Sequence, residues 1–258
     1  MTKDDFLNIT RPLEEETSVF ETIRSYGGHI LGLDEHLTRL RESANTLGIP
    51  FPYSAVELKE KIADELKHFK EKDMLIRPTI YRSRLHFFTS PIPKLEASWY
   101  EDGIKVTTAP ERLSLTNAAP VGAKSTWYGP QALTHLMDHF QDSFEVLFLD
   151  PLGFVGEPRV NNIFIVKQNI LKTPPAVHIL NGVTRRVMLS LARQIPLAVE
   201  ETPLTRHDLY NADECFITNS VIEALPVKEL DGRKIGCGQA GPVARKLRAL
   251  YQKAIYGK

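Results

Sequence analysis

Lys124 is the residue whose surroundings in the sequence point most directly to chemistry. It is the only formally charged side chain between Leu113 and Met137, although a stretch of that length would ordinarily hold roughly six. A lysine kept away from water and counter-ions is less stable as an ammonium ion, so its pKa falls and its amine becomes a nucleophile. The alternative is a loop lysine that is simply exposed, and this stretch taken alone favours that alternative.

Glu157 is a second candidate, because it lies among the apolar residues of two expected strands. Phe154 and Val155 precede it, and a further apolar strand begins at Ile163. A carboxylate held against apolar strands needs a cationic partner, or it becomes protonated. The partner could be a cationic ring nitrogen of a ligand or the nearby Arg159, and the sequence leaves both alternatives open.

Two short polar stretches could bind an anion. In "LNGVTRRV" the chain turns at Asn181 and Gly182, and a helix is expected to open at Thr184. Free N–H groups and a hydroxyl at a helix start bind anions. Residues 218–220, "TNS", place three short polar side chains at the end of an expected strand. Plain N-capping by Asn181 or Thr184, which is the commoner situation, and ordinary turn chemistry at 218–220 are the alternatives.

Composition and motifs exclude several other classes. His135 and His139 have metal-ligand spacing, but no third ligand is apparent, so a solvated helix face is favoured. Lys plus Arg and Asp plus Glu are equal at 32 each, which gives no sign of a nucleic-acid or membrane partner. No apolar run approaches a membrane span. Two cysteines and a polar N-terminus without the apolar core of a signal peptide lead us to expect a cytoplasmic location.

The expected helices and strands occur in blocks, which favours an α+β fold over a doubly wound sheet. A hairpin with a Gly27-Gly28 turn is expected first, then a helix capped by Asp34 and a second helix opened by a Ser54–Glu57 capping box. The strand at 74–82 contains Pro78, which needs an edge or a bulge. The later expected elements are strands at 103–113, 144–150, 161–166, 170–175 and 214–220, and helices at 130–140, 184–195 and 241–255.

From about Thr17 to Tyr251 the chain resembles the fold-type IV pyridoxal-phosphate (PLP) enzymes, the class IV aminotransferases. These include branched-chain aminotransferases, D-amino acid aminotransferases and aminodeoxychorismate lyase. "SVFETIRSYGGHILGLDEHLTRLRESANTLGIP" is similar to the family's N-terminal hairpin and helix, and "GEPRVNNIFIV", "LKTPP", "LNGVTRRV", "ADECFITNSVIEALPV" and "GPVARKL" follow in family order and spacing. We expect a small N-terminal domain at 1–112, a linker at 113–122 and a large cofactor-binding domain at 123–258. The resemblance also implies a homodimer.

The resemblance implies PLP as the cofactor and a role for each matching residue. Lys124 would hold the cofactor's aldehyde covalently and then move a proton between the substrate and the cofactor. Glu157 would keep the pyridine nitrogen protonated, and Tyr128 would donate a hydrogen bond to the phenolic oxygen. The phosphate would be bound by four further residues: Arg39, Val183, Thr184 and Ser220.

The resemblance leaves the substrate less defined. "LIRPTIYR" is similar to the branched-chain enzymes, in which the arginine that matches Arg77 can contact a second carboxylate, such as that of glutamate. Arg84 and His86 are similar, more faintly, to the Arg-x-His carboxylate site of D-amino acid aminotransferases. Trp127 stands where the family often has asparagine, and Pro158 where it usually has glycine, so the pocket is expected to be unusual.

We therefore expect an aminotransferase that moves an amino group between a branched-chain or other apolar L-amino acid and a 2-oxo acid. A PLP-dependent aminodeoxychorismate lyase and a D-amino acid aminotransferase are alternatives on the same fold, since cleavage and transamination need no different residues. A non-catalytic dimer that keeps the fold is a third, supported only by the short start before "SVFET", where the family usually carries more chain.

Overall fold

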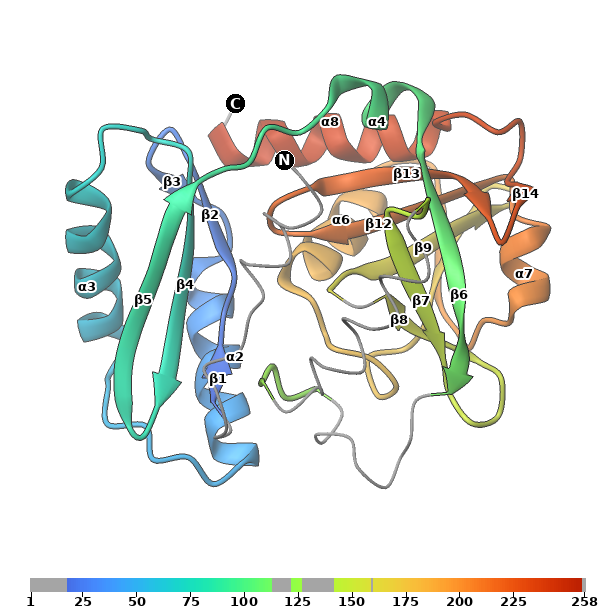
Figure 1. Cartoon of the computed structure of the whole chain (residues 1–258). Coiled ribbons are helices and arrows are strands. Elements are labelled where there is room, and N and C mark those ends of the chain that lie inside the picture. Colours follow the sequence, from blue (N-terminus) through green and yellow to red (C-terminus); the bar gives the residue numbers. More distant parts are fainter. Residues whose placement is uncertain (1–17, 113–121, 127–141, 159, 257–258) are drawn as a thin grey trace. The chain divides into compact units, whose positions relative to one another are not determined.

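The computed structural model describes residues 18–112, 122–126, 142–158 and 160–256 (Figure 1). The chain forms two compact units. Unit 1 comprises Met1–Lys94, Gly122–Pro130 and Ala254–Lys258, and unit 2 comprises Leu95–Val121 and Gln131–Lys253. The first segment of unit 1 ends at Lys94, whereas the small N-terminal domain is predicted to end at residue 112. The strand at 104–112 pairs with strands of unit 2, which accounts for the difference. The predicted linker falls on residues of which only Gly122 is described, so the domain boundaries stay a prediction.

Unit 1 is a five-stranded antiparallel sheet covered by two helices (Figure 1). The strands are β1 (Val19–Phe20), β2 (Ile23–Tyr26), β3 (His29–Ile30), β4 (Met74–Tyr81) and β5 (Arg84–Pro91). The Gly27-Gly28 turn joins β2 to β3 as predicted, and both glycines have the positive φ that such a turn requires. β5 pairs with the whole of β4, so β1 and β2 share the other edge of β4, one after the other.

Pro78 lies in an interior strand, contrary to the expectation of an edge or a bulge. It falls where the neighbouring chain passes from β1 to β2, because β1 pairs with Thr79 and Ile80, and β2 pairs with Leu75 and Ile76. The carbonyl of Pro78 accepts the Glu21 N–H at 3.0 Å. The interruption between β1 and β2 therefore lets the sheet accommodate a residue that has no N–H to donate.

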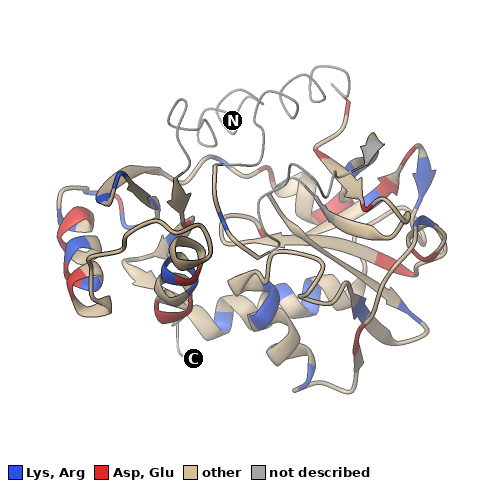
Figure 2. Cartoon of the chain, turned by 90° about the horizontal axis from the view of Figure 1, so that it is seen from below, with Lys and Arg blue, Asp and Glu red and all other residues tan. Residues whose placement is uncertain are grey.

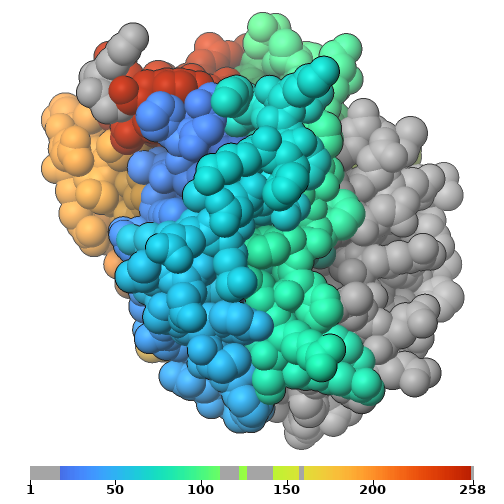
Figure 3. Space-filling view, turned by 90° about the vertical axis from the view of Figure 1, so that its left-hand side faces the viewer, coloured from blue at the N-terminus to red at the C-terminus, as the bar shows by residue number. Residues whose placement is uncertain are grey.

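The helices of unit 1 pack side by side on one face of its sheet. They are α2 (Leu33–Thr46) and α3 (Ala55–Lys67), and their buried leucines and isoleucines meet Ile23, Met74 and Ile76 in one core. The predicted capping box of Ser54 and Glu57 is confirmed. The predicted Asp34 cap is wrong, since Gly32 in the left-handed conformation is the N-cap of α2. Figure 3 shows the outer surface of this unit, with α2 and α3 in blue and cyan.

Unit 2 is built on a nine-stranded mixed sheet. Its strand order is β11-β10-β9-β12-β13-β6-β7-β8, with β14 beside β13. The bounds are β6 (Ile104–Arg112), β7 (Glu145–Leu149), β8 (Val155–Pro158), β9 (Asn162–Lys167), β10 (Ile170–Thr173), β11 (Ala198–Glu201), β12 (Glu214–Asn219), β13 (Glu223–Leu230) and β14 (Arg233–Lys234). The prediction that the strands from β7 to β10 form one meander is wrong, because β7 pairs with β8 and β9 pairs with β10, but β9 lies between β10 and β12 in the sheet and none of its described residues pairs with β8. The helix predicted at 130–140, with His135 and His139, lies outside the described residues.

Each face of this sheet packs against helices. One face carries the main apolar core, to which α4 (Ala97–Asp102) and α7 (Arg206–Tyr210) contribute. On the other face Phe164 and Phe216 stack with ring centroids 5.0 Å apart. α6 (Val183–Ala192) contacts β12, and α8 (Pro242–Tyr256) closes the described chain. The predicted α+β class is confirmed. Acidic and basic residues occur together along the helices and strands of both units (Figure 2).

Candidate active site

In unit 1 the backbone of Lys124 is fixed by two elements. Its N–H donates to the Ser43 hydroxyl of α2 at 2.9 Å, and its carbonyl accepts the Phe20 N–H of β1 at 3.2 Å. The next residue, Ser125, forms an isolated antiparallel bridge with Val19, so this short segment lies beside β1. Sequence reasoning found no role for Ser43, whose hydroxyl accepts a hydrogen bond from the Lys124 N–H.

The ring of Phe20 lies against two cations. The Lys124 Nζ is 4.9 Å from the ring centroid, and the Arg77 Cζ is 4.3 Å from it. Both distances are within the range of cation–π attraction. Arg77 is only 9% exposed, and this burial lowers its pKa to about 10, so it remains charged at neutral pH. The structure thus brings together two residues predicted separately, around an aromatic ring that the sequence did not single out.

Arg84 and His86, the other two predicted substrate residues, lie on β5 and are exposed. Their neighbours Leu85 and Phe87 pack on the helix-covered core of unit 1. Because side chains alternate along a strand, Arg84 and His86 are on the opposite face of the sheet. His86 pairs across the sheet with Thr79, and Thr79 pairs with Phe20. All the described candidate substrate residues therefore share one face.

Arg39 is buried and forms a bidentate ion pair with Glu21. Its Nε and Nη2 donate to the two carboxylate oxygens at 2.6 and 2.7 Å. The His36 ring contributes a third bond, Nδ1 to Oε2 at 2.7 Å. Since an ionised carboxylate only accepts hydrogen bonds, His36 carries its proton on Nδ1. Sequence reasoning identified Arg39 but not Glu21, whose partners lie 15 and 18 residues away.

Glu21 remains ionised inside this cluster. Burial by itself would raise the pKa of Glu21, but the charges and hydrogen bonds of Arg39 and then of His36 outweigh burial and hold that pKa well below its ordinary value. Burial lowers the pKa of His36, against the opposing attraction of Glu21. The positive charge of Arg39 is thus balanced by Glu21. A phosphate role for Arg39 stays a prediction and would use N–H groups beyond the two bound to this carboxylate.

In unit 2 the start of α6 is not capped by any side chain. Its N-cap is Gly182, and neither of the alternatives Asn181 and Thr184 caps it. A Cβ at position 182 would stand 2.0 Å from Asn162 Oδ1, so the close approach of β9 requires glycine there. Val183 and Thr184 are both buried. The first N–H groups of a helix have no partner within that helix, which leaves this one suited to an anion.

The turn after β12 is built around Asn219. Its side-chain oxygen accepts the Val221 and Ile222 N–H groups at 2.8 and 2.9 Å, and its amide donates to Asn161 at 2.9 Å. Ordinary turn chemistry, one of the two alternatives that the sequence left open for residues 218–220, therefore explains Asn219. Ser220, the predicted phosphate residue, is half-buried in the turn. The buried hydroxyl of Thr218 has no hydrogen-bond partner among the described residues.

Three predicted site residues are placed only partly or not at all. The backbone of Glu157 lies in β8, but its side chain is outside what the structure describes. Trp127 and Tyr128 lie outside the described residues. Within the described ranges no group of His, Cys, Asp and Glu side chains could hold a metal ion. No helix there is long and apolar enough to cross a membrane.

Comparisons with known proteins identify the family. The family described as amino-transferase class IV matches residues 18–230. The branched-chain-amino-acid aminotransferase of Pseudomonas aeruginosa is 32% identical over 97% of this chain and 88% of that protein. The D-alanine aminotransferase of Bacillus licheniformis is 30% identical over 92% and 87%.

A solved structure gives the same result. The T.th. branched-chain amino acid aminotransferase with pyridoxamine 5'-phosphate has a TM-score of 0.85 and 30% identity, and the match covers 93% of this chain and 86% of that one. The same T.th. enzyme has been solved with N-(5'-phosphopyridoxyl)-L-glutamate, and that structure has a TM-score of 0.81. The predicted fold-type IV architecture is thereby confirmed. The chain belongs to the class IV aminotransferases.

Proposed function

We propose that this class IV aminotransferase moves an amino group between a branched-chain or other apolar L-amino acid and 2-oxoglutarate, with PLP as its cofactor. The observation that carries the proposal is the position of the Lys124 amine, 4.9 Å from the Phe20 ring that Arg77 also contacts. An amine fixed through its backbone beside an aromatic ring and a buried guanidinium is suited to act on a substrate that has both an apolar part and a carboxylate.

The described residues fit the proposed cofactor. A phosphate needs N–H donors and hydroxyls, and the uncapped start of α6 with Thr184 offers both. PLP, when bound, supplies an aldehyde that takes up the amino group and a ring that accepts electrons from the substrate. Glu157 would hold a proton at the ring nitrogen, and Arg39 and Ser220 would complete the phosphate contacts. Lys124 would remove the proton from the substrate α-carbon through Nζ and return it in the reverse half-reaction.

Arg77 and Phe20 support the choice of substrates. One site must accept an apolar amino acid in one half-reaction and an acidic 2-oxo acid in the other. The Phe20 ring offers apolar contact to the first, and the Arg77 guanidinium offers a charge-assisted hydrogen bond to the second carboxylate of the other. The names of the P. aeruginosa and T.th. relatives support the branched-chain substrate, and the glutamate adduct of the T.th. enzyme supports an acidic partner.

A donor screen tests the substrate. Leucine, valine, isoleucine, L-glutamate and D-alanine are each supplied with 2-oxoglutarate or pyruvate, and the new amino acid is measured by chromatography. We expect transfer from the branched-chain L-amino acids. Transfer from D-alanine alone would contradict the proposal, and pyruvate release from aminodeoxychorismate without any 2-oxo acid would indicate the lyase.

Lys124→Ala tests the lysine. Borohydride reduction followed by peptide mass spectrometry should find the cofactor on residue 124 of the wild-type protein and nowhere in the variant. We expect activity to fall about 10²–10⁴-fold, the usual contribution of a general acid–base group. A borohydride-fixed adduct on another lysine of the wild-type protein would show that the assignment is wrong.

A homodimer and a cytoplasmic location are parts of the same proposal. The free, unpaired state of Cys215 and Cys237 supports a reducing compartment. Light scattering of the purified protein measures the oligomeric state, and a monomer that transfers amino groups at full rate would contradict the dimer.

A further inference from the structure

Arg185 directly follows Thr184 and has no part in the proposed chemistry. It is 1% exposed and is among the largest fully buried side chains of the described chain. A guanidinium keeps its charge under all ordinary conditions, so burying it is unfavourable unless partners replace the lost water. Its contacts therefore identify what the residue holds in place.

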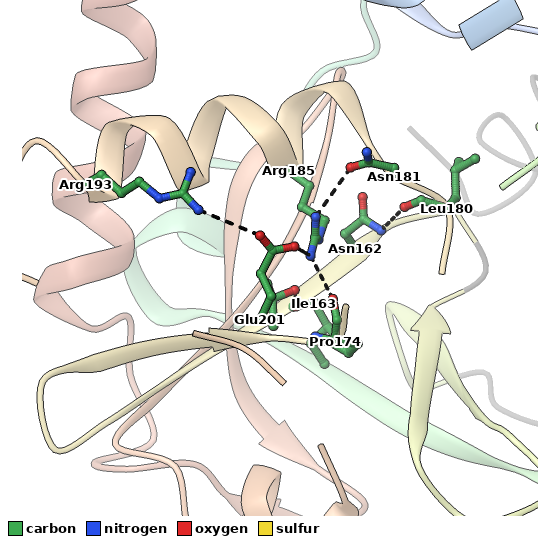
Figure 4. Close-up of polar contacts among 9 residues, drawn as sticks. Asn162, Ile163, Pro174, Leu180, Asn181, Arg185, Arg193 and Glu201 are labelled. Atoms are coloured by element: carbon green, nitrogen blue, oxygen red, sulfur yellow. Dashed lines mark hydrogen bonds and ion pairs between the residues drawn. The ribbon is translucent and has the colours of Figure 1, made fainter. Parts of the chain in front are cut away.

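The side chain joins three separate segments of unit 2 (Figure 4). Its Nη2 donates to Glu201 Oε2 on β11 at 2.6 Å and to the Pro174 carbonyl at the end of β10 at 2.8 Å. Its Nη1 donates to the side-chain oxygen of Asn181 at 3.4 Å. Its Nε has no partner among the described residues. The Arg185 guanidinium therefore contacts β11, the residue that follows β10, and the loop that precedes α6.

The segment 174–182, which links β10 to α6, depends on such contacts. It contains no helix or strand, and its backbone hydrogen bonds include His178 N–H to the Pro175 carbonyl and Gly182 N–H to the Leu180 carbonyl. Asn162 fixes its second half by donating to the Leu180 carbonyl at 2.8 Å, while Arg185 fixes both of its ends (Figure 4). The direction in which the α6 N–H groups point follows from where this segment lies.

Glu201 is the ion-pair partner of Arg185 and is itself partly exposed to solvent. Its side chain is 37% exposed, and its second oxygen lies 3.7 Å from Arg193, at the other end of α6. One carboxylate therefore contacts both ends of the helix. The neighbouring residue on β11, Glu200, instead pairs with Lys172 of β10 at 3.0 Å and makes no ion pair with α6 among the described residues. The two adjacent glutamates offer a matched comparison.

We propose that Arg185, held by Glu201, is a positioning residue for phosphate binding: it keeps segment 174–182 and the start of α6 in the shape that receives the phosphate of PLP. The inference rests on the proposed function, and it adds two residues to the site that touch neither cofactor nor substrate. The inference predicts different effects on the two ends of the cofactor. Loss of the pair weakens binding of the phosphate end and leaves binding through the aldehyde unchanged.

The test compares Glu201→Gln, Arg185→Lys and the control Glu200→Gln in the full-length protein. Affinities for PLP and for pyridoxal, which has the aldehyde but no phosphate, are measured by absorbance titration. Thermal melting checks that each variant folds. We expect Glu201→Gln and Arg185→Lys to bind PLP about ten- to a hundredfold more weakly, as for loss of a hydrogen bond to a charged group. Their affinity for pyridoxal and both affinities of Glu200→Gln should match wild type.

Two outcomes overturn the inference. Wild-type affinity for PLP in Glu201→Gln would show that the pair does not position the phosphate site, and an equal loss for PLP and pyridoxal would show a merely structural role. Should Arg185→Lys fail to fold, Glu201→Gln decides, since its side chain is partly exposed. Failure of the wild-type protein itself to bind PLP would instead refute the proposed function, and this inference with it.

Discussion

Replacing Glu21 with glutamine tests the buried cluster of unit 1. Glu21 is 0% exposed and accepts two hydrogen bonds from Arg39 and one from His36. The amide keeps the shape of the side chain but removes the charge, which leaves the Arg39 guanidinium buried without its counter-ion. Removing one partner of a buried pair costs about 3–5 kcal/mol of unfolding free energy. With a urea m-value of about 2–3 kcal/mol/M, the midpoint should fall by roughly 1–2 M.

The pH dependence gives a second, independent measure. The pKa of Glu21 in the folded protein lies well below its ordinary value, so the ion pair contributes fully above the unfolded pKa of about 4.3 and is lost as the pH falls toward the folded pKa. Wild-type stability should therefore exceed that of Glu21→Gln at pH 7, and the difference should shrink below about pH 4. Urea unfolding followed by circular dichroism at about pH 7, 4 and 3 measures both quantities.

Two further variants make the result decisive. Asp64→Asn removes an exposed carboxylate of α3 that pairs with Lys67, and should leave the midpoint unchanged. The double variant Glu21→Met with Arg39→Met removes both buried charges and should be more stable than Glu21→Gln alone. A Glu21→Gln midpoint within experimental error of wild type at pH 7 would refute the reasoning, as would a difference that does not depend on pH.

Three other predictions concern separate parts of the chain. Arg77→Met should raise the KM for 2-oxoglutarate about ten- to a hundredfold, through loss of a buried charge pair, while the KM for an apolar 2-oxo acid changes little; equal changes in steady-state assays would contradict the assignment. Gly182→Ala should destabilise the protein by about 1–3 kcal/mol, because the new Cβ meets Asn162 Oδ1, and Asn162→Ala should restore part of that loss in urea unfolding. Burial raises the pKa of Cys215 to about 12, whereas Cys237 is exposed, so Ellman's reagent at pH 8 should titrate one thiol in the native chain and two after unfolding; two native thiols would show that Cys215 is accessible.

Features that depend on nearby residues could be predicted from the sequence. The Ser54–Glu57 capping box and the Gly27-Gly28 turn formed as expected because each needs only a few consecutive residues. Asp34 failed as a cap because Gly32, two residues earlier, adopts the left-handed conformation at the start of α2. A good capping residue indicates that a helix begins nearby, and the backbone decides at which residue.

Long-range polar pairs were the features that the sequence did not reveal. Glu21 stands among strand residues with nothing local to mark it, since Arg39 and His36 come from α2. Arg185 was expected only as part of a helix, since Glu201 lies 16 residues further on and Pro174 11 residues before it. The resemblance to a family pointed to Lys124, Arg39 and Thr184. It did not identify the carboxylates that balance buried guanidinium groups near them, because such partners are defined only once the chain is folded.

Two consecutive residues at the junction of β1 and β2 differ in how freely they can be substituted. Phe20 and Glu21 are consecutive, yet the Phe20 ring meets Arg77 and Lys124 while the Glu21 carboxylate meets α2. A library that randomises position 20 together with Arg77 should therefore yield folded proteins with altered substrate preference. The same library shifted by one residue, to position 21, should yield mostly insoluble ones. For directed evolution of this enzyme, the face of the sheet to which a residue points therefore determines whether its position tolerates substitution.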